Sequence, residues 1–90
     1  MAQPGTVTVE FYGIPRRRAG RSELVVPAGT VAQVLTAIER ACPGLSGLCN
    51  DKGLSGHYLL SVNGDRFVRR LDEVMQPGLH LLLLSADAGG

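Results

Sequence analysis

The stretch PGLHLLLLSADAGG, residues 77–90, decides the fold. An almost wholly apolar run follows a Pro-Gly turn, which predicts a strand over residues 79–84. Because side chains alternate along a strand, every second residue is expected to face a helix: Leu79, Leu81 and Leu83. The other set faces the opposite side of the sheet: His80, Leu82 and Leu84. Small and acidic residues then precede two glycines, so we expect a domain over residues 1–84 and a flexible tail over residues 85–90.

Two further strands are predicted near the start of the chain. TVTVEFY, residues 6–12, alternates between apolar and polar positions, as a half-buried strand does. GIPRRRAGR contains the turn residues glycine and proline, and SELVV reads as a second short strand. Residues 6–26 are therefore predicted to form a hairpin with a long loop.

The clearest helix is predicted over residues 31–41. Thr30 can cap its first turn, and Gln33 follows at the spacing of a capping box. Apolar residues then recur with helical spacing on one face, which should pack on a sheet: Val31, Val34, Leu35 and Ile38. Pro43 and Gly44 end the helix.

The remaining segments complete the order β-β-α-β-β-β. Residues 42–56 read as a long connection with at most one helical turn, and RRLDEVMQPG reads as a charged turn or a single helical turn. Between them, HYLLSV, the turn Asn63-Gly64 and DRFV predict a tight hairpin. The sequence thus predicts an α+β fold with a mixed sheet of about five strands and one main helix.

Composition narrows the functional class. The chain has 90 residues, 44% of them apolar and 19% charged, which is typical of one small globular domain. A net charge of +1 argues against a nucleic-acid binder, and no segment reads as a membrane span or export signal. We therefore expect a cytoplasmic protein. Cys42 and Cys49 lack the spacing of a zinc site, so no metal is expected.

The element order, with the motifs that punctuate it, resembles one family. A strand ending in VNG, a PG turn into an apolar strand and a final GG are similar to the sulfur-carrier branch of the ubiquitin-like proteins. That branch includes the small subunit of molybdopterin synthase and the thiamin-biosynthesis sulfur carrier. The resemblance implies a β-grasp fold, in which the last strand lies beside the first in the centre of the sheet. QPG stands where the molybdopterin branch has DGD, so the pathway stays open.

The resemblance implies a chemistry at the two glycines. A ubiquitin-activating-type enzyme, using ATP and magnesium, would adenylate Gly90, and a sulfur donor would convert the adenylate to a thiocarboxylate. Gly89 would give access to the narrow site of the partner, because it has no Cβ. The protein would be a co-substrate rather than an enzyme and would bind no cofactor itself. The large subunit of molybdopterin synthase is a further implied partner.

An apolar patch on the sheet suggests where partners dock. The side predicted to face away from the helix carries Tyr12, Leu59, Leu82 and Leu84. Two basic clusters, in residues 16–21 and 66–70, either guide an acidic partner or anionic substrate or are solvated loop charge. Two other functions remain open: a protein modifier joined to lysines through Gly90, and a β-grasp interaction module with an inert tail.

Overall fold

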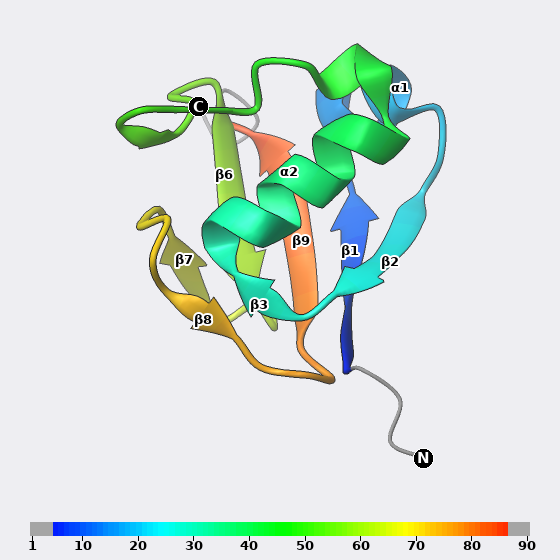
Figure 1. The fold of residues 1–90 in the computed structure, drawn as a ribbon. Helices are drawn as coiled ribbons and strands as arrows, with labels where there is room; N and C mark the ends of the chain where they lie inside the picture. The colour runs from blue at the N-terminus through cyan, green and yellow to red at the C-terminus, as the bar shows by residue number, and fades with distance from the viewer. Residues whose placement is uncertain (1–4, 87–90) are drawn as a thin grey trace.

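The computed structural model describes residues 5–86 of the chain. Its centre is a five-stranded sheet with the strand order β2-β1-β9-β6-β7, and helix α2 crosses one face of it (Figure 1). The strands of this sheet are β1 (Thr6–Phe11), β2 (Glu23–Pro27), β6 (Tyr58–Val62), β7 (Arg66–Val68) and β9 (His80–Ser85). The α+β fold with one main helix is confirmed, and it is the β-grasp arrangement.

Strand β9 lies in the centre of the sheet, as predicted. It runs parallel to β1, with Val9 beside Leu81 and Phe11 beside Leu83. It runs antiparallel to β6, where Leu60 is paired with Leu83. Both edges of β9 are therefore hydrogen-bonded to other strands of the same sheet.

Helix α2 (Val31–Ala41) has the predicted bounds. Its first turn is closed by a capping box: Thr30 Oγ1 accepts from the Gln33 N–H at 3.2 Å, and Gln33 Oε1 accepts from the Thr30 N–H at 2.9 Å. The predicted apolar stripe is buried against the sheet. Two orphan N–H groups at the helix start are thereby satisfied, which fixes where the helix begins.

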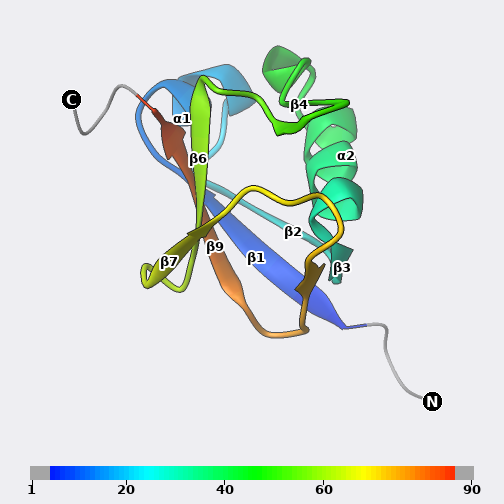
Figure 2. The same cartoon turned by 90° about the vertical axis from the view of Figure 1, so that its left-hand side faces the viewer.

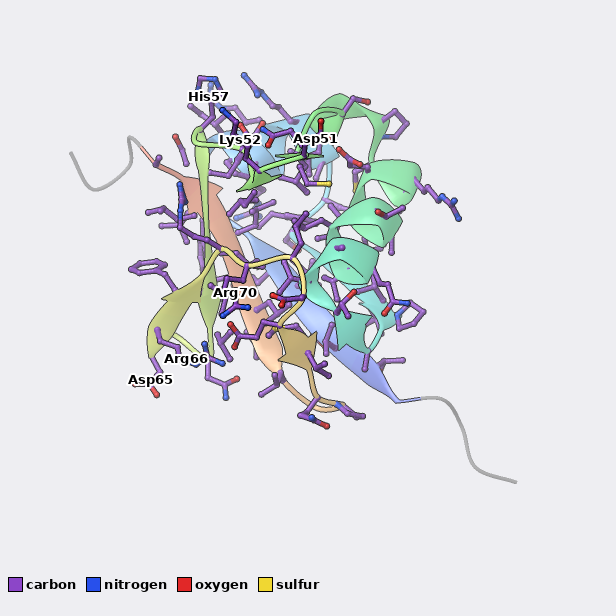
Figure 3. The ribbon with its side chains drawn as sticks, turned by 60° about the vertical axis from the view of Figure 1, so that its left-hand side comes forward. Asp51, Lys52, His57, Asp65, Arg66 and Arg70 are labelled. Carbon is purple, nitrogen blue, oxygen red and sulfur yellow. The ribbon has the colours of Figure 1, made fainter. Side chains whose placement is uncertain are left out.

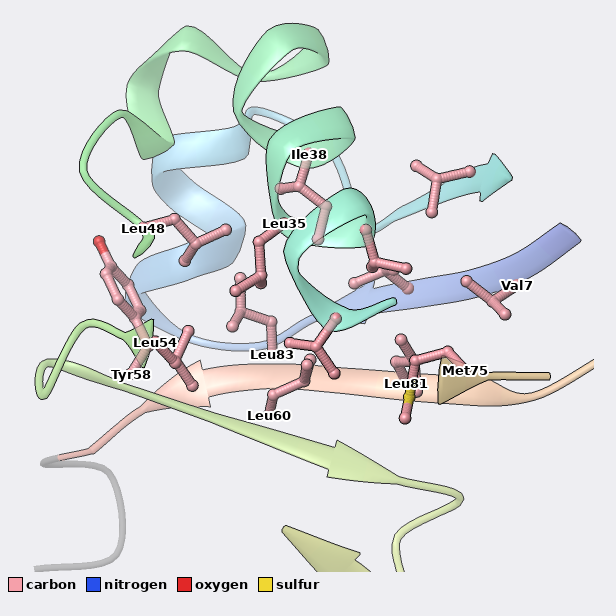
Figure 4. Packing of buried hydrophobic residues seen from close by; sticks show 14 of the residues in the cluster. Val7, Leu35, Ile38, Leu48, Leu54, Tyr58, Leu60, Met75, Leu81 and Leu83 are labelled. Carbon is pink, nitrogen blue, oxygen red and sulfur yellow. The ribbon is translucent and has the colours of Figure 1, made fainter. Parts of the chain in front are cut away.

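The core lies between α2 and the sheet (Figure 4). Leu81 and Leu83 are fully buried there, whereas Leu79 is half-buried and packs at the margin. Around them the core collects apolar side chains from most elements, among them Val7, Val9, Phe11, Leu35, Ile38, Leu48, Leu60 and Met75. The predicted facing of β9 is therefore confirmed for these leucines.

A short helix stands where the sequence predicted only a loop. Helix α1 (Ile14–Ala19) connects β1 to β2, with Pro15 in its first turn and Gly20 in the left-handed conformation at its end. The prediction was wrong because it treated this proline and glycine as breakers. At the first and last positions of a helix, both residues favour it instead.

The loops contain further short elements. The 42–56 connection holds one 3-10 turn, η1 (Pro43–Leu45), as allowed, and also a small hairpin of β4 (Cys49–Asn50) and β5 (Gly53–Leu54). The predicted charged turn contains β8 (Val74–Met75), which pairs with β3 (Gly29–Thr30) at the start of α2. Met75 is buried in the core, so tertiary packing gives this segment a strand that its local sequence did not indicate.

The β6–β7 hairpin forms, but its register differs from that of a two-residue turn. Asn63 and Gly64 both have positive φ, and the Asp65 N–H bonds the Val62 carbonyl at 2.9 Å, as in a tight turn. The strand pairing nevertheless joins Val62 to Arg66, which leaves Asp65 as an extra residue. One extra residue moves every following side chain to the other face of the sheet.

Strand β9 continues one residue beyond the predicted domain boundary at residue 84. Ser85 is buried and pairs with Tyr58, and the Ala86 N–H bonds the His57 carbonyl at 2.9 Å. Within residues 5–86 the longest helix has 11 residues, and none has the length and apolarity needed to cross a bilayer.

A glycine contact between α1 and η1 provides a test of this packing. A Cβ on Gly44 would lie 2.1 Å from the backbone oxygen of Arg18, whereas a Cβ on Gly56 would meet nothing within 4 Å. Gly44→Ala should therefore lower the free energy of unfolding in urea by about 1–3 kcal/mol, because backbone must move to admit the methyl group. Gly56→Ala should change it by no more than about 1 kcal/mol. Equal effects of the two substitutions would contradict the close approach of α1 and η1.

Candidate functional site

The predicted docking residues lie on the outer face, the side of the five-stranded sheet opposite α2 (Figure 2). Leu84 pairs directly with Leu59, and Leu82 pairs with Ser61 of the same strand. Tyr12 follows β1 and its N–H bonds the Leu83 carbonyl at 3.0 Å. The three leucines are half-buried and Tyr12 is 44% exposed. The fold thus brings the four residues onto one face, while Gly89 and Gly90 lie outside the described residues.

Phe67 is an additional apolar residue of the outer face that sequence reasoning missed. It pairs with Ser61, which pairs in turn with Leu82, and its side chain is 59% exposed. A two-residue turn would have placed Phe67 opposite Leu60, facing the core. The extra residue Asp65 turns the Phe67 side chain outward. The sequence could have indicated this only through the length of the turn, and the Asn-Gly motif wrongly suggested a turn of two residues.

A polar cluster borders the apolar residues. Glu10 lies beside Leu82 in the sheet, and its Oε1 accepts a hydrogen bond from His80 Nε2 at 2.8 Å. The hydrogen bond from His80 lowers the pKa of the Glu10 carboxyl, and a second one from Tyr12 lowers it further. The same bond to Glu10 raises the pKa of the Tyr12 hydroxyl. The Glu10 carboxylate therefore stays ionised to lower pH than usual and is held in place beside the predicted docking residues by His80 and Tyr12.

The chain leaves the sheet at a well-anchored point, which we call the strand exit and define by Ser85 and Ala86. Tyr58, the strand partner of Ser85, accepts a hydrogen bond from Arg18 Nη1 of α1 at 2.6 Å. Helix α1 also packs against β9. Figure 2 shows α1 beside the tip of β9 and the start of β6. Residues 87–90 thus follow a position that three elements fix.

The cysteines and histidines do not form a catalytic or metal cluster within residues 5–86. Cys42 is buried, Cys49 is half-buried, and both are free thiols. Burial raises the pKa of the Cys49 thiol, with a smaller contribution from the nearby Glu39 carboxylate, so this thiol is less reactive than usual. No group of three or more potential ligands that could hold a metal ion occurs in the part of the chain that the structure describes.

The fold and the strand exit define a class, the ubiquitin-like β-grasp domain. The sequence matches no family model and no curated protein. Among solved structures it is similar to small archaeal modifier protein 1 (SAMP1) from Haloferax volcanii, with 26% identity over 96% of this chain and 100% of that one and a TM-score of 0.78. It is also similar to CysO in the BexX/CysO complex of Amycolatopsis orientalis, with 27% identity, 93% and 99% coverage and a TM-score of 0.77.

A third similar structure is a protein-protein complex of subunits 1 and 2 of the molybdopterin-converting factor from Helicobacter pylori. The identity is 21% over 94% of this chain and 99% of that one, with a TM-score of 0.64, so this likeness concerns the fold. The resemblance to the ubiquitin-like sulfur carriers is confirmed over nearly the whole chain. The similar structures support a carrier or modifier rather than a catalyst, and two of them contain a partner protein.

The pKa of Glu10 gives a pH prediction. Because its folded-state pKa is lowered, Glu10 should stabilise the fold above the pKa it has in the unfolded chain, and this contribution should be lost as the pH falls through the folded-state pKa. A carbon-13 NMR titration should place the midpoint of the Glu10 carboxyl below that of an ordinary glutamate. His80→Ala should move it upward more than Tyr12→Phe does, since the His80 bond is the larger cause. An unchanged midpoint in His80→Ala would show that the pair does not form in solution.

The facing of β9 gives a second prediction. Leu84→Asp should leave the circular dichroism spectrum and the cooperative unfolding transition in place, because Leu84 lies on the outer face. Leu83→Asp should prevent folding, because Leu83 is fully buried beside α2. If the outer face docks an adenylating enzyme, as the resemblance implies, binding of that enzyme to the folded Leu84→Asp protein should weaken by about tenfold or more, measured by titration calorimetry. Unfolding of Leu84→Asp would reverse the assignment of the two faces.

Proposed function

We propose that this protein is a sulfur carrier that is adenylated and then thiocarboxylated at Gly90. It donates its sulfur in the biosynthesis of a cofactor, and the pathway we favour is that of molybdopterin. One observation carries the proposal: the central strand of the sheet presents Leu82 and Leu84 to the outside and is anchored on both edges directly before the segment that contains Gly89 and Gly90. A partner bound to the outer face would receive that segment. The similarity to SAMP1 and CysO supports the same class.

The chemistry needs little from this chain beyond an accessible carboxylate. An oxygen of the Gly90 carboxylate attacks the α-phosphorus of ATP and releases pyrophosphate, which leaves an acyl adenylate. A hydrosulfide ion supplied by the sulfur donor then attacks the carbonyl carbon and expels AMP, which leaves a thiocarboxylate and releases a proton. ATP and magnesium belong to the adenylating enzyme, so the carrier itself would bind no cofactor and would act as a co-substrate.

The residue types of the last segment fit this use. Gly89 and Gly90 present no Cβ near the reacting carbon and can adopt backbone conformations that other residues avoid. The residues before the two glycines are also small: Ala86 and Ala88 flank Asp87, the one acidic residue of this segment. In the molybdopterin-type arrangement, the thiocarboxylate would enter a larger catalytic subunit, and the Helicobacter pylori complex of subunits 1 and 2 supports such a partner.

A second candidate is a protein modifier joined to lysines of other proteins through Gly90. The similarity to small archaeal modifier protein 1 favours it. Activation is the same in both functions, because the adenylated carbonyl of Gly90 can also pass its acyl group to a lysine amine, with release of AMP. The chain carries a single lysine, Lys52, which is exposed near the β4–β5 hairpin (Figure 3). Self-conjugates would therefore have to pass through Lys52 or the N-terminal amine.

Deletion of Gly90 tests the proposal. The carboxylate would then stop one residue, about 3.5 Å, short of the phosphate. ATP–pyrophosphate exchange with the cognate adenylating enzyme should fall by at least 100-fold, on the order of 3 kcal/mol of lost positioning. The melting temperature should stay the same, because the deleted residue lies beyond the last strand. Gly56→Ala serves as a control, since a Cβ there meets nothing within 4 Å.

Intact mass of the protein from its native host separates the candidates. A sulfur-for-oxygen mass increase supports the carrier, and masses of conjugates with other proteins support the modifier. An unmodified mass together with full exchange activity in the Gly90 deletion would overturn both and leave an interaction module whose tail is inert.

A further inference from the structure

Helix α1 and the turn after it carry a dense basic cluster, which we call the arginine cluster and define as Arg16, Arg17, Arg18 and Arg21. All four side chains are exposed. No acidic residue stands in the first turn of α1. Four positive charges within six residues repel one another, so this arrangement has a cost that the fold does not require.

The arginine cluster has no bonded acidic partner within the described residues, although the charge of Arg16 contributes to the lowered pKa of the Glu10 carboxyl. Across residues 5–86, none of its members forms a salt bridge; Arg18 donates to the Tyr58 hydroxyl, and Arg21 Nε donates to the Glu23 carbonyl. The second basic cluster behaves differently. There Arg66 is bonded to Glu73 and Arg70 to Asp72. The four arginines of the arginine cluster, unlike Arg66 and Arg70, therefore have no bonded carboxylate within the described residues.

Helix α1 is also held rigidly at the strand exit. Pro15 is buried, the Arg18 backbone touches Gly44 of η1, and the Arg18 side chain is tied to Tyr58 at 2.6 Å. Tyr58 is the strand partner of Ser85, two residues before Asp87. Helix α1, which carries Arg16, Arg17 and Arg18, therefore packs beside the strand exit, and Arg18 is the member of the arginine cluster that is bonded there.

From this arrangement we infer that the arginine cluster docks an acidic surface of the enzyme that adenylates the tail, and that it acts chiefly by steering the encounter. The inference rests on the proposed function and adds the chemistry of the partner surface. Exposed charges contribute little affinity each, because water and salt screen them. Their summed field extends over about 10 Å at 0.1 M salt and raises association rates. A carrier that must bind, react and leave gains more from a fast encounter than from a tight one.

A protein surface fits these observations better than a nucleic acid or a membrane. The whole chain has a net charge of only +1, and the outer face beside the cluster is apolar with an anionic edge at Glu10. Single-stranded nucleic acid needs exposed aromatic rings along a basic groove. The aromatic residue that Arg18 contacts, Tyr58, is buried, and the exposed Tyr12 is hydrogen-bonded to the Glu10 carboxylate. An anionic lipid surface would be met by an amphipathic helix much longer than the six residues of α1.

The experiment compares two double charge reversals of equal size. Arg16→Glu with Arg17→Glu removes half of the arginine cluster and spares Arg18, which is bonded to Tyr58. Arg69→Glu with Arg70→Glu is the matched control, because these residues are also adjacent and exposed, and Arg70 lies between His57 and Arg66, away from His57 (Figure 3). The weaker pair Arg16→Gln with Arg17→Gln guards against destabilisation of α1. Thermal melts establish that each variant is folded.

The readout is ATP–pyrophosphate exchange by the cognate adenylating enzyme, with this protein as the varied substrate, at about 50 mM and about 500 mM salt. At low salt the Arg16/Arg17 reversal should lower kcat/KM about tenfold with kcat unchanged, and the glutamine pair should lower it less. At high salt all proteins should converge, because screening removes the field. The Arg69/Arg70 control should stay within about twofold of the unmodified protein.

Four results would overturn the inference. Equal losses in both double reversals would show an effect of net charge alone, and a loss confined to kcat would place the arginines in the chemical step. Undiminished kcat/KM in the Arg16/Arg17 reversal would leave the cluster as solvated charge. Binding of poly-U RNA or of phosphatidylserine vesicles that depends on Arg16 and Arg17 would assign it to another partner. If the unmodified protein supports no exchange at all, the proposed function itself fails, which is a distinct outcome.

Discussion

The pairing of β9 on both of its edges is the constraint on which the rest of the molecule depends. A strand between β1 and β6 cannot shift without breaking two sets of backbone hydrogen bonds, so its register is fixed. Leu81 and Leu83 must then enter the core under α2, and Leu82 and Leu84 must lie on the outer face. The same strand therefore builds the core with one set of side chains and an apolar surface with the other. A continuous run of leucines is typical of a strand that is buried on both faces. In β9, however, only one face of the run lies in the core and the other is partly exposed.

The central position of β9 also fixes where the segment with the proposed reactive residue, Gly90, begins. Ser85 pairs with Tyr58, the first residue of β6, and the Ala86 N–H bonds the carbonyl of the preceding residue, His57. Helix α1 contacts the same end of the sheet through the hydrogen bond from Arg18 to Tyr58. The position of residue 86 is thus set by the tertiary structure rather than by the tail. Gly90 is the fourth residue after Ala86, so the two are at most about 13 Å apart. Under the proposed function, a partner bound to the outer face would therefore find the Gly90 carboxylate within this distance of the strand exit.

The sequence predicted the parts of this fold that rest on short-range rules. The capping box at Thr30 and Gln33 set the start of α2, and period-two alternation assigned the faces of β1 and β9. It could not predict β8, since Val74 and Met75 form a strand only because β3 and the core are present. Phe67 was missed because a single extra residue, Asp65, reverses the face of β7 after a turn whose dihedral angles look ordinary. Gly89 and Gly90 remain predictions, since they lie outside the described residues.

Under the two proposals, the outer face and the arginine cluster would divide recognition between two kinds of force. Apolar contact at Leu59, Phe67, Leu82 and Leu84 would act at short range and depend on shape, so it would select the partner once the surfaces meet. The charge on α1 would act before contact and depend on ionic strength, so it would set how often the surfaces meet. Because α1 packs against the end of β9, a partner steered to α1 would arrive beside the strand exit and the outer face.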